Sequence, residues 1–329
     1  MTIDRATRRR RVRSQVALLV AGAVLAVGSA AYGASTTQVL AAVKASIKIQ
    51  TLPSSTSPSL TEALNDVHSL QVAGANWILN SCDPYWIHAQ ATKPIPCIYG
   101  DAKSKKTVVL FGDSNAGNWV PALDILFKAM GYRLALFGFI GCTTAPVPET
   151  ATSQPGFPGQ WQLCNTWHAS LPAAVRAQKP IAIMEAASPW MTLDAQEVAD
   201  WVPAMKSAFD QMTIGSPKTL RIELGTTPLF PAIMPTCLAA NPTAIQKCGV
   251  NFSNPMSPYS LLLARDAKIA SAAKAILLPS WQWLCYQHEC SPLIKNFMVV
   301  VDRDHTSTPY VKYIEGALAS SFAKKVKLP

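Results

Sequence analysis

The chain has 329 residues, of which 49% are hydrophobic and 15% charged, and its formal net charge at pH 7 is +10. This composition excludes disordered and fibrous proteins, because such chains lack the apolar side chains needed for a core. Half of the net charge comes from six arginines and one aspartate near the N-terminus. The remaining charge is mild and we expect it to be scattered over the surface, and the lack of basic-aromatic clusters argues against a nucleic-acid partner.

Residues 1–34 have the features of an export segment. A run of arginines, Arg8–Arg11, precedes an apolar stretch from Val16 to Ala34, and small residues at 29–31 fit a cleavage site. The stretch is also close to the ~20 residues that span a bilayer. A cleaved signal peptide and a retained membrane anchor therefore both remain open. In either case the positive-inside rule predicts an extracytoplasmic protein, secreted or anchored in the cell envelope.

Residues 35–80 are predicted to connect this segment to the main domain. Serine, threonine, alanine and proline dominate residues 35–58, which is typical of a spacer. Residues 59–70 are predicted to form a short helix, because Leu60, Leu64 and Val67 would share one face. The domain proper is expected to occupy residues 81–329, beginning with an extended segment between Cys82 and Cys97.

From Lys106 onward, strand-like and helix-like stretches alternate. The predicted strands are short apolar runs: Thr107–Phe111, Arg133–Phe137, Ile181–Glu185, Leu220–Leu224, Ala275–Leu278 and Phe297–Val301. The predicted helices lie between and after them: Trp119–Met130, Leu163–Ala177, Ala195–Met212, Ser260–Ala273 and Pro309–Phe322. Apolar runs separated by helices indicate a parallel sheet buried on both faces. The predicted fold is therefore α/β, a doubly wound, flavodoxin-like sheet flanked by helices.

Ligands of such sheets bind at the carboxyl ends of the strands. Ser114 follows the first predicted strand and begins a helix, where a nucleophile is exposed and the helix N-terminus favours negative charge. Asp302 and His305 follow the last predicted strand and supply a carboxylate and a base. Asp304 is a competing carboxylate, but a neighbour of the histidine usually points elsewhere. These residues predict a Ser-His-Asp site for ester hydrolysis or acyl transfer.

The chain resembles the SGNH (GDSL-like) hydrolase superfamily over roughly residues 80–329. The resemblance rests on five stretches: Val108–Leu123, Gly131–Pro146, Pro180–Trp190, Thr226–Leu238 and Val299–Tyr310. It is closest to SGNH domains that are attached to, or work beside, membrane acyltransferases modifying cell-surface sugars. The resemblance implies the SGNH fold, a serine acyl-enzyme and no cofactor.

Carried over to this sequence, the resemblance implies that Ser114 is the nucleophile, His305 the general base and Asp302 its orienting carboxylate. It also implies an oxyanion hole formed by the backbone N–H groups of Ser114 and Gly141, with Gly138 as the alternative to Gly141.

The chain departs from the family at the third oxyanion donor. Superfamily members usually carry an asparagine in the region corresponding to residues 184–190, where this chain has none. Of the Arg-Trp pair common in the acyltransferase-associated branch, only Trp190 is present, and we expect it to line the pocket. Asn115 and Asn118, close to the nucleophile in sequence, are candidate replacement donors.

Eight cysteines in an exported chain predict disulfides. They fall into neighbouring pairs: Cys82/Cys97, Cys142/Cys164, Cys237/Cys248 and Cys285/Cys290. A zinc site is the rival interpretation, but no Cys-x-x-Cys or His-x-x-x-His spacing supports it, so no metal is predicted. The bridge at Cys142 would hold the neighbouring Gly141 in place.

The sequence predicts an exported O-acyltransferase or acyl esterase, most simply for acetyl groups, acting on a carbohydrate of the cell envelope. Its expected partners are an O-acylated carbohydrate or cell-wall glycan and a separate multi-span membrane acyltransferase as donor. The alternative is a catalytically idle SGNH domain that binds carbohydrate or acts as a scaffold, which the missing asparagine favours.

Overall fold

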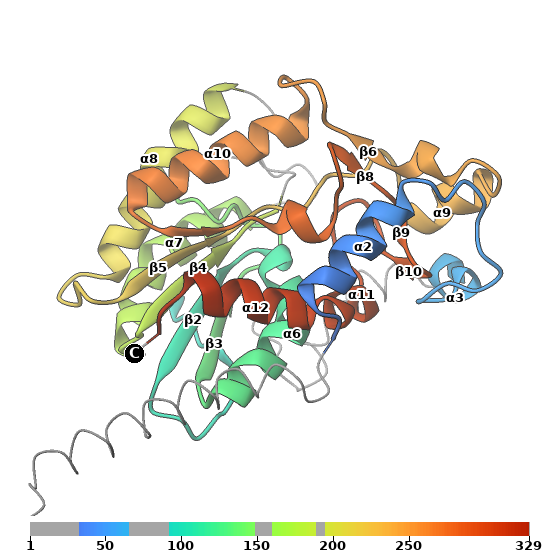
Figure 1. Ribbon diagram of the computed structural model, residues 1–329. Helices are drawn as coiled ribbons and strands as arrows, with labels where there is room; N and C mark the ends of the chain where they lie inside the picture. Colours follow the sequence, from blue (N-terminus) through green and yellow to red (C-terminus); the bar gives the residue numbers. More distant parts are fainter. Residues whose placement is uncertain (1–32, 66–91, 149–159, 189–194, 329) are drawn as a thin grey trace, which may run out of the picture.

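The computed structural model describes residues 33–65, 92–148, 160–188 and 195–328. Its centre is a six-stranded sheet (Figure 1). The strands are β1 (Cys97–Gly100), β2 (Thr107–Gly112), β3 (Arg133–Gly138), β4 (Ala182–Ala186), β5 (Leu220–Leu224) and β7 (Ile276–Leu278). Their order is β1-β3-β2-β4-β5-β7. Strands β2, β3, β4, β5 and β7 are parallel, and β1 is antiparallel to β3 at one edge.

The five parallel strands have the order of a flavodoxin-like sheet, so the predicted fold class is confirmed. Strand β2 shows why the sequence adopts it, because all six of its residues are buried. Val108 and Leu110 contribute to one hydrophobic cluster, whereas Val109 and Phe111 contribute to the other. Side chains of a strand alternate between the two faces of its sheet, so β2 supplies both cores.

Helices cover both faces of the sheet. They are α6 (Ser114–Met130) and α12 (Glu315–Lys325) on one face, and α7 (Gln160–Ala177), α8 (Ala195–Met212) and α10 (Pro258–Ala273) on the other. Helix α6 begins at an N-cap, Asp113, whose side chain accepts from the Asn115 amide, and ends at Gly131 with a positive φ of 72°. Such caps satisfy the unpaired backbone groups at each end of a helix.

The remaining elements form a layer at the right of Figure 1, beyond the end of the sheet. They are α2 (Thr36–Ser46), α3 (Leu60–Asn65), α9 (Met234–Ala240), η5 (Ile245–Cys248), β6 (Val250–Asn251), η6 (Ser280–Trp283), β8 (Glu289–Cys290), β9 (Leu293–Ile294), β10 (Phe297–Met298) and α11 (Thr308–Tyr313). Strands β9 and β10 pair with each other, as do β6 and β8.

The sixth predicted strand, Phe297–Val301, is wrong as a strand of the main sheet. Only β10, at its start, is a strand, and it pairs with β9 in a separate two-stranded sheet. Val299, Val300 and Val301 are buried, which explains the strand-like apolar run, but they do not pair with a strand of the main sheet. The sixth position in the sheet belongs to β1.

The region predicted to be a spacer also differs. Helix α2 begins with a capping box between Ser35 and Gln38 and buries Val39 and Val43 in the main core. The four-residue spacing of these valines places them on one helical face, and Ala-rich surroundings favour the helix. The predicted helix 59–70 is seen as α3, and residues beyond Asn65 lie outside the described part of the chain.

The export segment, residues 1–32, also lies outside the described residues. Among the helices that the structure describes, none combines the length and the apolar character needed to cross a bilayer.

Three of the four predicted disulfides are confirmed, namely Cys142–Cys164, Cys237–Cys248 and Cys285–Cys290. Cys97 is disulfide-bonded as well, whereas Cys82, its predicted partner, lies outside the described residues.

Candidate active site

Ser114 occupies the first position of helix α6, immediately after strand β2. The turn between them depends on Gly112, because a Cβ atom there would lie 2.0 Å from the carbonyl oxygen of Ala186 on the adjacent strand. The close approach of the two strands therefore requires glycine at this position. The first N–H groups of a helix have no acceptor within the helix, so this turn favours an anion near the Ser114 hydroxyl.

His305 lies beside this serine and joins it to a carboxylate. Its Nε2 is 2.7 Å from the Oγ of Ser114, and its Nδ1 is 2.6 Å from the Oδ2 of Asp302. The second oxygen of Asp302 accepts from the backbone N–H groups of His305, at 2.8 Å, and Asp304, at 3.0 Å. With Nδ1 donating to Asp302, the neutral form of the imidazole has Nε2 free to accept from the serine hydroxyl.

A loop carries Asp302 and His305 to the serine. The backbone N–H of Val301 donates to the carbonyl of His305 at 2.9 Å, which closes the loop on itself. The N–H of Met234, the first residue of α9, donates to the carbonyl of Asp302 at 2.9 Å. Asp302 and His305 therefore lie near Ser114, as predicted. A loop held by these hydrogen bonds places them there, and they do not follow a strand of the main sheet.

Asp304 is turned mainly toward buried polar groups. One of its oxygens is 3.4 Å from His305 Nδ1, and the other accepts from Asn115 Nδ2 at 2.9 Å and from the Ser188 hydroxyl at 3.0 Å. Asp302 thus makes the shorter contact with the histidine. Asp304 adds a second negative charge near the ring and binds the loop to helix α6.

Ser188 is a residue that the sequence analysis missed. Its backbone N–H donates to Asp113 at 2.7 Å, and its hydroxyl donates to Asp304. It follows strand β4 and links Asp113, the N-cap of α6, to Asp304 in the loop that carries His305. The available signal was its position at the carboxyl end of the strand beside β2, but serine is common after strands, so position alone did not distinguish it.

The proposed replacement donors, Asn115 and Asn118, are unsuited to that role. Both are 1% exposed. Asn115 donates to Asp304, and its oxygen accepts from Asn118 Nδ2 at 2.9 Å and from the Thr227 hydroxyl at 3.3 Å. Their amide groups thus form hydrogen bonds within the protein and support the residues around Ser114 and His305. Burial and pairing of this kind are not visible in a sequence.

The proposed second oxyanion donor, Gly141, lies in the loop that follows β3, with a positive φ of 73°. The next residue, Cys142, is bonded to Cys164 on helix α7, and its N–H donates to the carbonyl of Phe139 at 3.2 Å. The disulfide therefore ties this loop to a helix. Gly138, the alternative donor, is the last residue of β3 and pairs in register with Gly112. Trp190 lies outside the described residues.

The charges around the imidazole set its protonation. Burial alone would lower the pKa of His305, but Asp304, Asp302 and Asp113 together raise it well above its ordinary value. Burial tends to raise the pKa of Asp302, yet its hydrogen bonds and the histidine hold that pKa below the ordinary value. Burial raises the pKa of Asp113 to about 7 despite two backbone N–H donors. The site thus stabilises an imidazolium beside Asp302.

This arrangement is suited to moving a proton from a serine hydroxyl. The ligand atoms of Asp302, Asp304 and His305 also lie within 4.8 Å of one another, the spacing of a metal site. The Nδ1 atom of His305 is, however, already hydrogen-bonded to Asp302, and its other nitrogen faces Ser114. The geometry therefore favours nucleophilic catalysis over metal binding.

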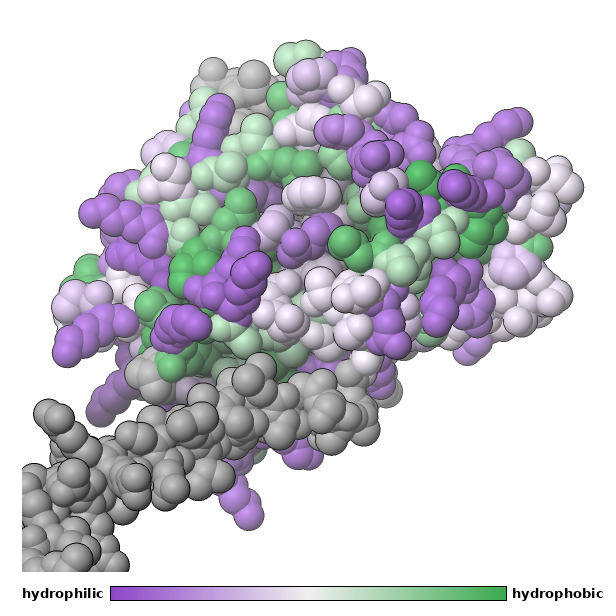
Figure 2. Space-filling model, in the orientation of Figure 1, coloured by the Kyte–Doolittle hydropathy of each residue, from purple (hydrophilic) through white to green (hydrophobic). Residues whose placement is uncertain are grey.

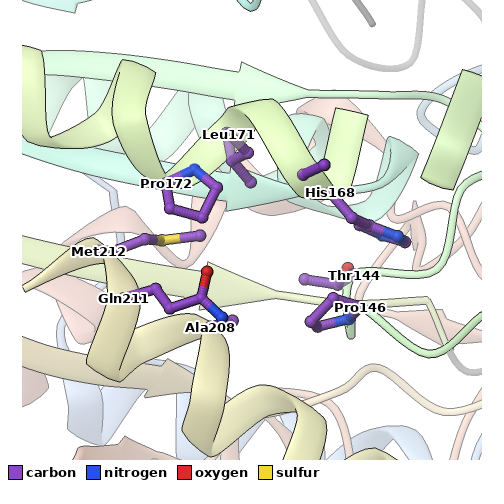
Figure 3. A pocket seen from close by; sticks show the side chains of 9 residues that line it. Thr144, Pro146, His168, Leu171, Pro172, Ala208, Gln211 and Met212 are labelled. Atoms are coloured by element: carbon purple, nitrogen blue, oxygen red, sulfur yellow. The ribbon is translucent and has the colours of Figure 1, made fainter. Parts of the chain in front are cut away.

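A separate cavity of about 190 Å³ lies on the other side of the sheet, where α7 approaches α8 (Figure 3). His168 and Met212 are among its lining residues, and His168 Nε2 is 2.7 Å from the carbonyl oxygen of Thr143. Neither Ser114 nor His305 lines it. It is therefore not the space in which the Ser114 hydroxyl would react.

The sequence matches a family described as "SGNH domain (fused to AT3 domains)" over residues 82–320. No curated protein sequence matches the chain. Among solved structures, it resembles a periplasmic domain of a Salmonella serovar Paratyphi A lipopolysaccharide acetyltransferase, with 14% identity, a TM-score of 0.55 and coverage of 79% of this chain and 96% of that one.

Another structural match is Est24, a carbohydrate acetylesterase from Sinorhizobium meliloti, at 14% identity and a TM-score of 0.40. That match covers 67% of this chain and 99% of the esterase chain.

Proposed function

Because the chain belongs to the family of SGNH domains that are fused to AT3 domains, and is thus a serine esterase or acyltransferase, we propose that it transfers or removes acyl groups on a carbohydrate of the cell envelope. Ser114, His305 and Asp302 would carry the reaction. The observation that carries this proposal is the continuous pair of contacts from the Ser114 hydroxyl, 2.7 Å to His305 and 2.6 Å onward to Asp302.

In the first half-reaction, the Oγ of Ser114 forms a bond to the acyl carbonyl carbon while His305 Nε2 takes the hydroxyl proton. Asp302 stabilises the resulting imidazolium. The negative oxygen of the tetrahedral intermediate is stabilised by N–H groups at the start of α6 and in the loop at Gly141. His305 then returns the proton to the departing oxygen, and the acyl group remains on Ser114 as an ester.

In the second half-reaction, an acceptor hydroxyl attacks this ester and gives its proton to His305. The serine oxygen then leaves and recovers that proton. If the acceptor is a sugar hydroxyl, the product is an acylated carbohydrate; if it is water, the product is a free acid. The same residues serve both outcomes, and the choice depends on whether the pocket seats a sugar and excludes water.

The substrate class and location follow from two supports. The similar Salmonella structure is a periplasmic domain of a lipopolysaccharide acetyltransferase, which favours acetyl groups and a surface carbohydrate. The three disulfides favour an oxidising compartment outside the cytoplasm. Since the family is described as fused to AT3 domains, we propose a membrane acyltransferase of that kind as the partner that delivers the acyl group.

The second candidate is a binding or scaffolding domain without activity. It is favoured by the absence of an asparagine from residues 184–190, where the family usually places an oxyanion donor, and by the burial of Asn115 and Asn118. Loss of one oxyanion donor lowers the rate by about 10²–10³. The intact contacts of Ser114, His305 and Asp302 favour the enzyme.

Hydrolysis of p-nitrophenyl acetate, with and without an oligosaccharide acceptor, tests the proposal. We expect nitrophenol release to fall by at least about 10³ in Ser114→Ala, in line with removal of a triad serine. Acetylated oligosaccharide in the mixture identifies a transferase, and acetate alone identifies an esterase. Equal rates for the wild type and Ser114→Ala would overturn the assignment. Sugar binding without turnover would favour the scaffold.

A further inference from the structure

Many of the basic side chains that the structure describes lie at one end of the sheet. A cation stands at the first residue of each parallel strand or within three residues before it, namely Lys106, Arg133, Lys179, Lys218 and Lys274. The amino ends of parallel strands all lie at the same end of the sheet, so these five residues lie at that end. We call this end, which includes the loops before β2, β4, β5 and β7, the basic edge. It lies opposite the edge that carries Ser114.

The chain's final helix adds to this edge. Phe322 of α12 packs edge-on against Phe127 near the end of α6, and Lys325 Nζ donates to the carbonyl of Leu277 in β7 at 3.1 Å. These contacts bring the exposed Lys324, Lys325 and Lys327 to the same end. Figure 2 shows hydrophilic residues around the left-hand end of the molecule, where Figure 1 places the C-terminus.

Stabilisation of helix dipoles explains the positions of only some of these cations. Cations in the last turn of a helix stabilise the negative end of its dipole, as Lys128 in α6 and Arg176 in α7 do. The effect fades beyond that turn. Lys103 and Lys105 are exposed in the loop between β1 and β2, outside any helix, so a structural role of this kind does not explain them.

Few acidic groups oppose these cations. Among the described residues, the acids near this edge are Asp101, Asp124 and Asp210. Asp124 is partly buried and accepts from the Gly100 N–H at 2.6 Å. Asp210 is paired with Lys206 at 2.5 Å and with Arg221 at 2.7 Å. Cations therefore outnumber acids among the described residues at the basic edge, whereas a scattered charge was expected from the sequence.

The basic edge also contains a hollow of about 720 Å³. Lys206, Lys218, Arg221 and Lys274 line it, and Asp210 is the acid among its lining residues. A concave surface with this lining concentrates field lines and favours a small anionic group such as a phosphate. Lysine acts here as a point charge, which suits phosphate in several orientations.

Two exposed apolar side chains stand among these cations. Ile214, in the turn between α8 and β5, is 65% exposed, and Met130, the last residue of α6, is 37% exposed. Binding of a soluble anionic polymer would require only the cations and not the exposed apolar side chains. Cations around protruding apolar side chains are instead the pattern of proteins that lie on a membrane, where the apolar groups enter the interface and the cations meet lipid phosphates.

We propose that the basic edge is a docking face for an anionic lipid bilayer, with the hollow at Lys218 and Lys274 receiving a phosphate headgroup. The six residues of β2 separate this edge from Ser114 by about 20 Å. A domain resting on the bilayer through this face presents its catalytic loop away from the lipid, toward carbohydrate outside the membrane. The inference concerns this face alone and stands whether or not the catalytic proposal holds.

Lysine footprinting of the full chain tests the orientation. The protein is added to vesicles of phosphatidylcholine alone, or with 30% phosphatidylglycerol, and treated with an amine acetylating reagent before mass spectrometry. We expect Lys105, Lys179 and Lys218 to react severalfold more slowly on the anionic vesicles, and this protection to disappear in 0.5 M NaCl. Control lysines in the layer at the other end, Lys48 and Lys247, should react equally on both.

Charge reversal gives a matched comparison. The variant Lys105→Glu/Lys179→Glu/Lys218→Glu and the control Lys48→Glu/Lys247→Glu/Lys295→Glu have the same net charge, and all six lysines are exposed. Each basic residue near an anionic bilayer contributes roughly a fivefold factor in partitioning. We expect the first variant to lose about 100-fold or more in binding to anionic vesicles, while the control loses far less. Equal melting temperatures of both variants and the wild type check that they are folded.

Three results would overturn the proposal. The first is equal reactivity of the edge lysines on neutral and anionic vesicles. The second is equal loss of binding in both variants, which would indicate a general charge effect. The third is protection of the edge lysines by soluble polyphosphate at matched phosphate concentration but not by vesicles, which would assign the face to an anionic polymer. None of these readouts involves ester turnover, so they do not depend on the proposed function.

Discussion

At the scale of single residues, the site is organised around one histidine and three buried carboxylates. Asp302 holds the ring by a short hydrogen bond, whereas Asp304 and Asp113 act mainly through their charge. All three raise the pKa of His305, so the ring holds its proton at a pH where an isolated histidine would have released it. The base form needed for attack on an ester is therefore favoured as the pH rises.

Two asparagine substitutions separate these roles. Asp302→Asn removes the group that selects the imidazole tautomer, and we expect kcat to fall by about 10⁴, as in other Ser-His-Asp triads. Asp304→Asn keeps that hydrogen bond but removes a negative charge, so it lowers the pKa of His305 and moves the acid limb of the activity profile to lower pH. Rates measured from pH 5 to 10 check both. Identical profiles for Asp304→Asn and the wild type would contradict the charge role.

The residue types with distinctive chemistry are the ones that the sequence identified. Ser114, Asp302 and His305 could be chosen because a nucleophile, an acid and a base were each placed at an expected strand end. Ser188 and Thr227 brace the same site, but hydroxyl residues follow many strands and their partners depend on tertiary contacts. The hydrogen-bond partners of Asn115 and Asn118 could not be predicted for the same reason.

At the scale of elements, the loop after β3 depends on its disulfide. Cys142 and Cys164 are 22 residues apart in sequence. Closing a loop of that length stabilises a protein by about 3 kcal/mol in the chain-entropy view. Because the bridge lies next to Gly141, its removal should loosen the proposed oxyanion donor as well as the fold.

We therefore expect Cys142→Ser/Cys164→Ser to lower both the melting temperature and kcat for an acetyl ester. The control Cys285→Ser/Cys290→Ser removes a bridge across five residues in the layer outside the sheet. It should lower the melting temperature less and leave kcat near the wild-type value. Equal kcat losses in the two variants, measured well below both melting temperatures, would argue against a specific role of the loop at Gly141.

Strands β4 and β5 carry a pair of buried acids, Glu185 and Glu223, which face each other in register. Burial raises the pKa of Glu185 from 4.5 to about 8 and raises that of Glu223 as well. The favourable contribution of protonated Glu185 to the free energy of unfolding is present below pH 4.5 and is lost as the pH rises through about 8. The charge of the neighbouring Arg265, which is paired with Asp266 at 2.9 Å, offsets part of the burial effect on both glutamates.

Replacing Glu185 with glutamine removes this titration. The free energy of unfolding of Glu185→Gln should therefore rise relative to the wild type between pH 5 and 8, by up to about 1.4 kcal/mol per pH unit. Urea unfolding at several pH values measures the difference. A difference that stays constant across this range would show that Glu185 does not bind its proton more tightly in the folded protein.

The helices and parallel strands could be predicted because each shows its own hydrophobic period. Helix α8 and strand β5 were predicted with the observed limits, and β2 and β3 with limits one residue short. The Phe297–Val301 run was misassigned, because an apolar run shows that a segment is buried and does not show which neighbour buries it. Strand β1 is four residues long and half-buried, so its hydrophobic pattern was too short to be recognised as a strand.

At the scale of the whole molecule, residues N-terminal to the sheet belong to the folded unit. Helix α2 contacts α12 and β9, and the Ala34 N–H donates to the carbonyl of Tyr313 at 2.6 Å. The Ser, Thr and Pro content around α2 led to the prediction of a spacer. Composition is an average over the whole stretch, whereas only a few apolar residues make the contacts of α2.

Alanine substitutions test this packing. Val39 and Val43 are each 1% exposed, so Val39→Ala and Val43→Ala should each lower the free energy of unfolding by about 2–3 kcal/mol. Leu40 on the same helix is 48% exposed, and Leu40→Ala should change it by less than about 0.5 kcal/mol. Chemical denaturation with an unchanged m-value measures this contrast. Equal stabilities of all three variants would contradict the packing of α2.

At the scale of the whole molecule, the proposed site and the proposed docking face lie at opposite ends of the sheet. The carboxyl ends of the strands hold Ser114 and the loop of His305, and the amino ends form the basic edge. The first end could be predicted from the Ser114 and Asp302–His305 motifs, although only Ser114 follows a strand of the main sheet. The second end could not be predicted, because its lysines are dispersed along the sequence and only the parallel sheet collects them.

The most direct test of the catalytic account is labelling of the protein with a fluorophosphonate, followed by mass spectrometry of the modified peptide. We expect one adduct, on Ser114, formed by the wild type and absent from Ser114→Ala and His305→Ala, with all three proteins folded by circular dichroism. An activated serine reacts in this way because its base removes the proton as the bond to phosphorus forms. A folded wild-type protein that remains unlabelled, or an adduct that persists in His305→Ala, would contradict a working Ser114–His305–Asp302 site.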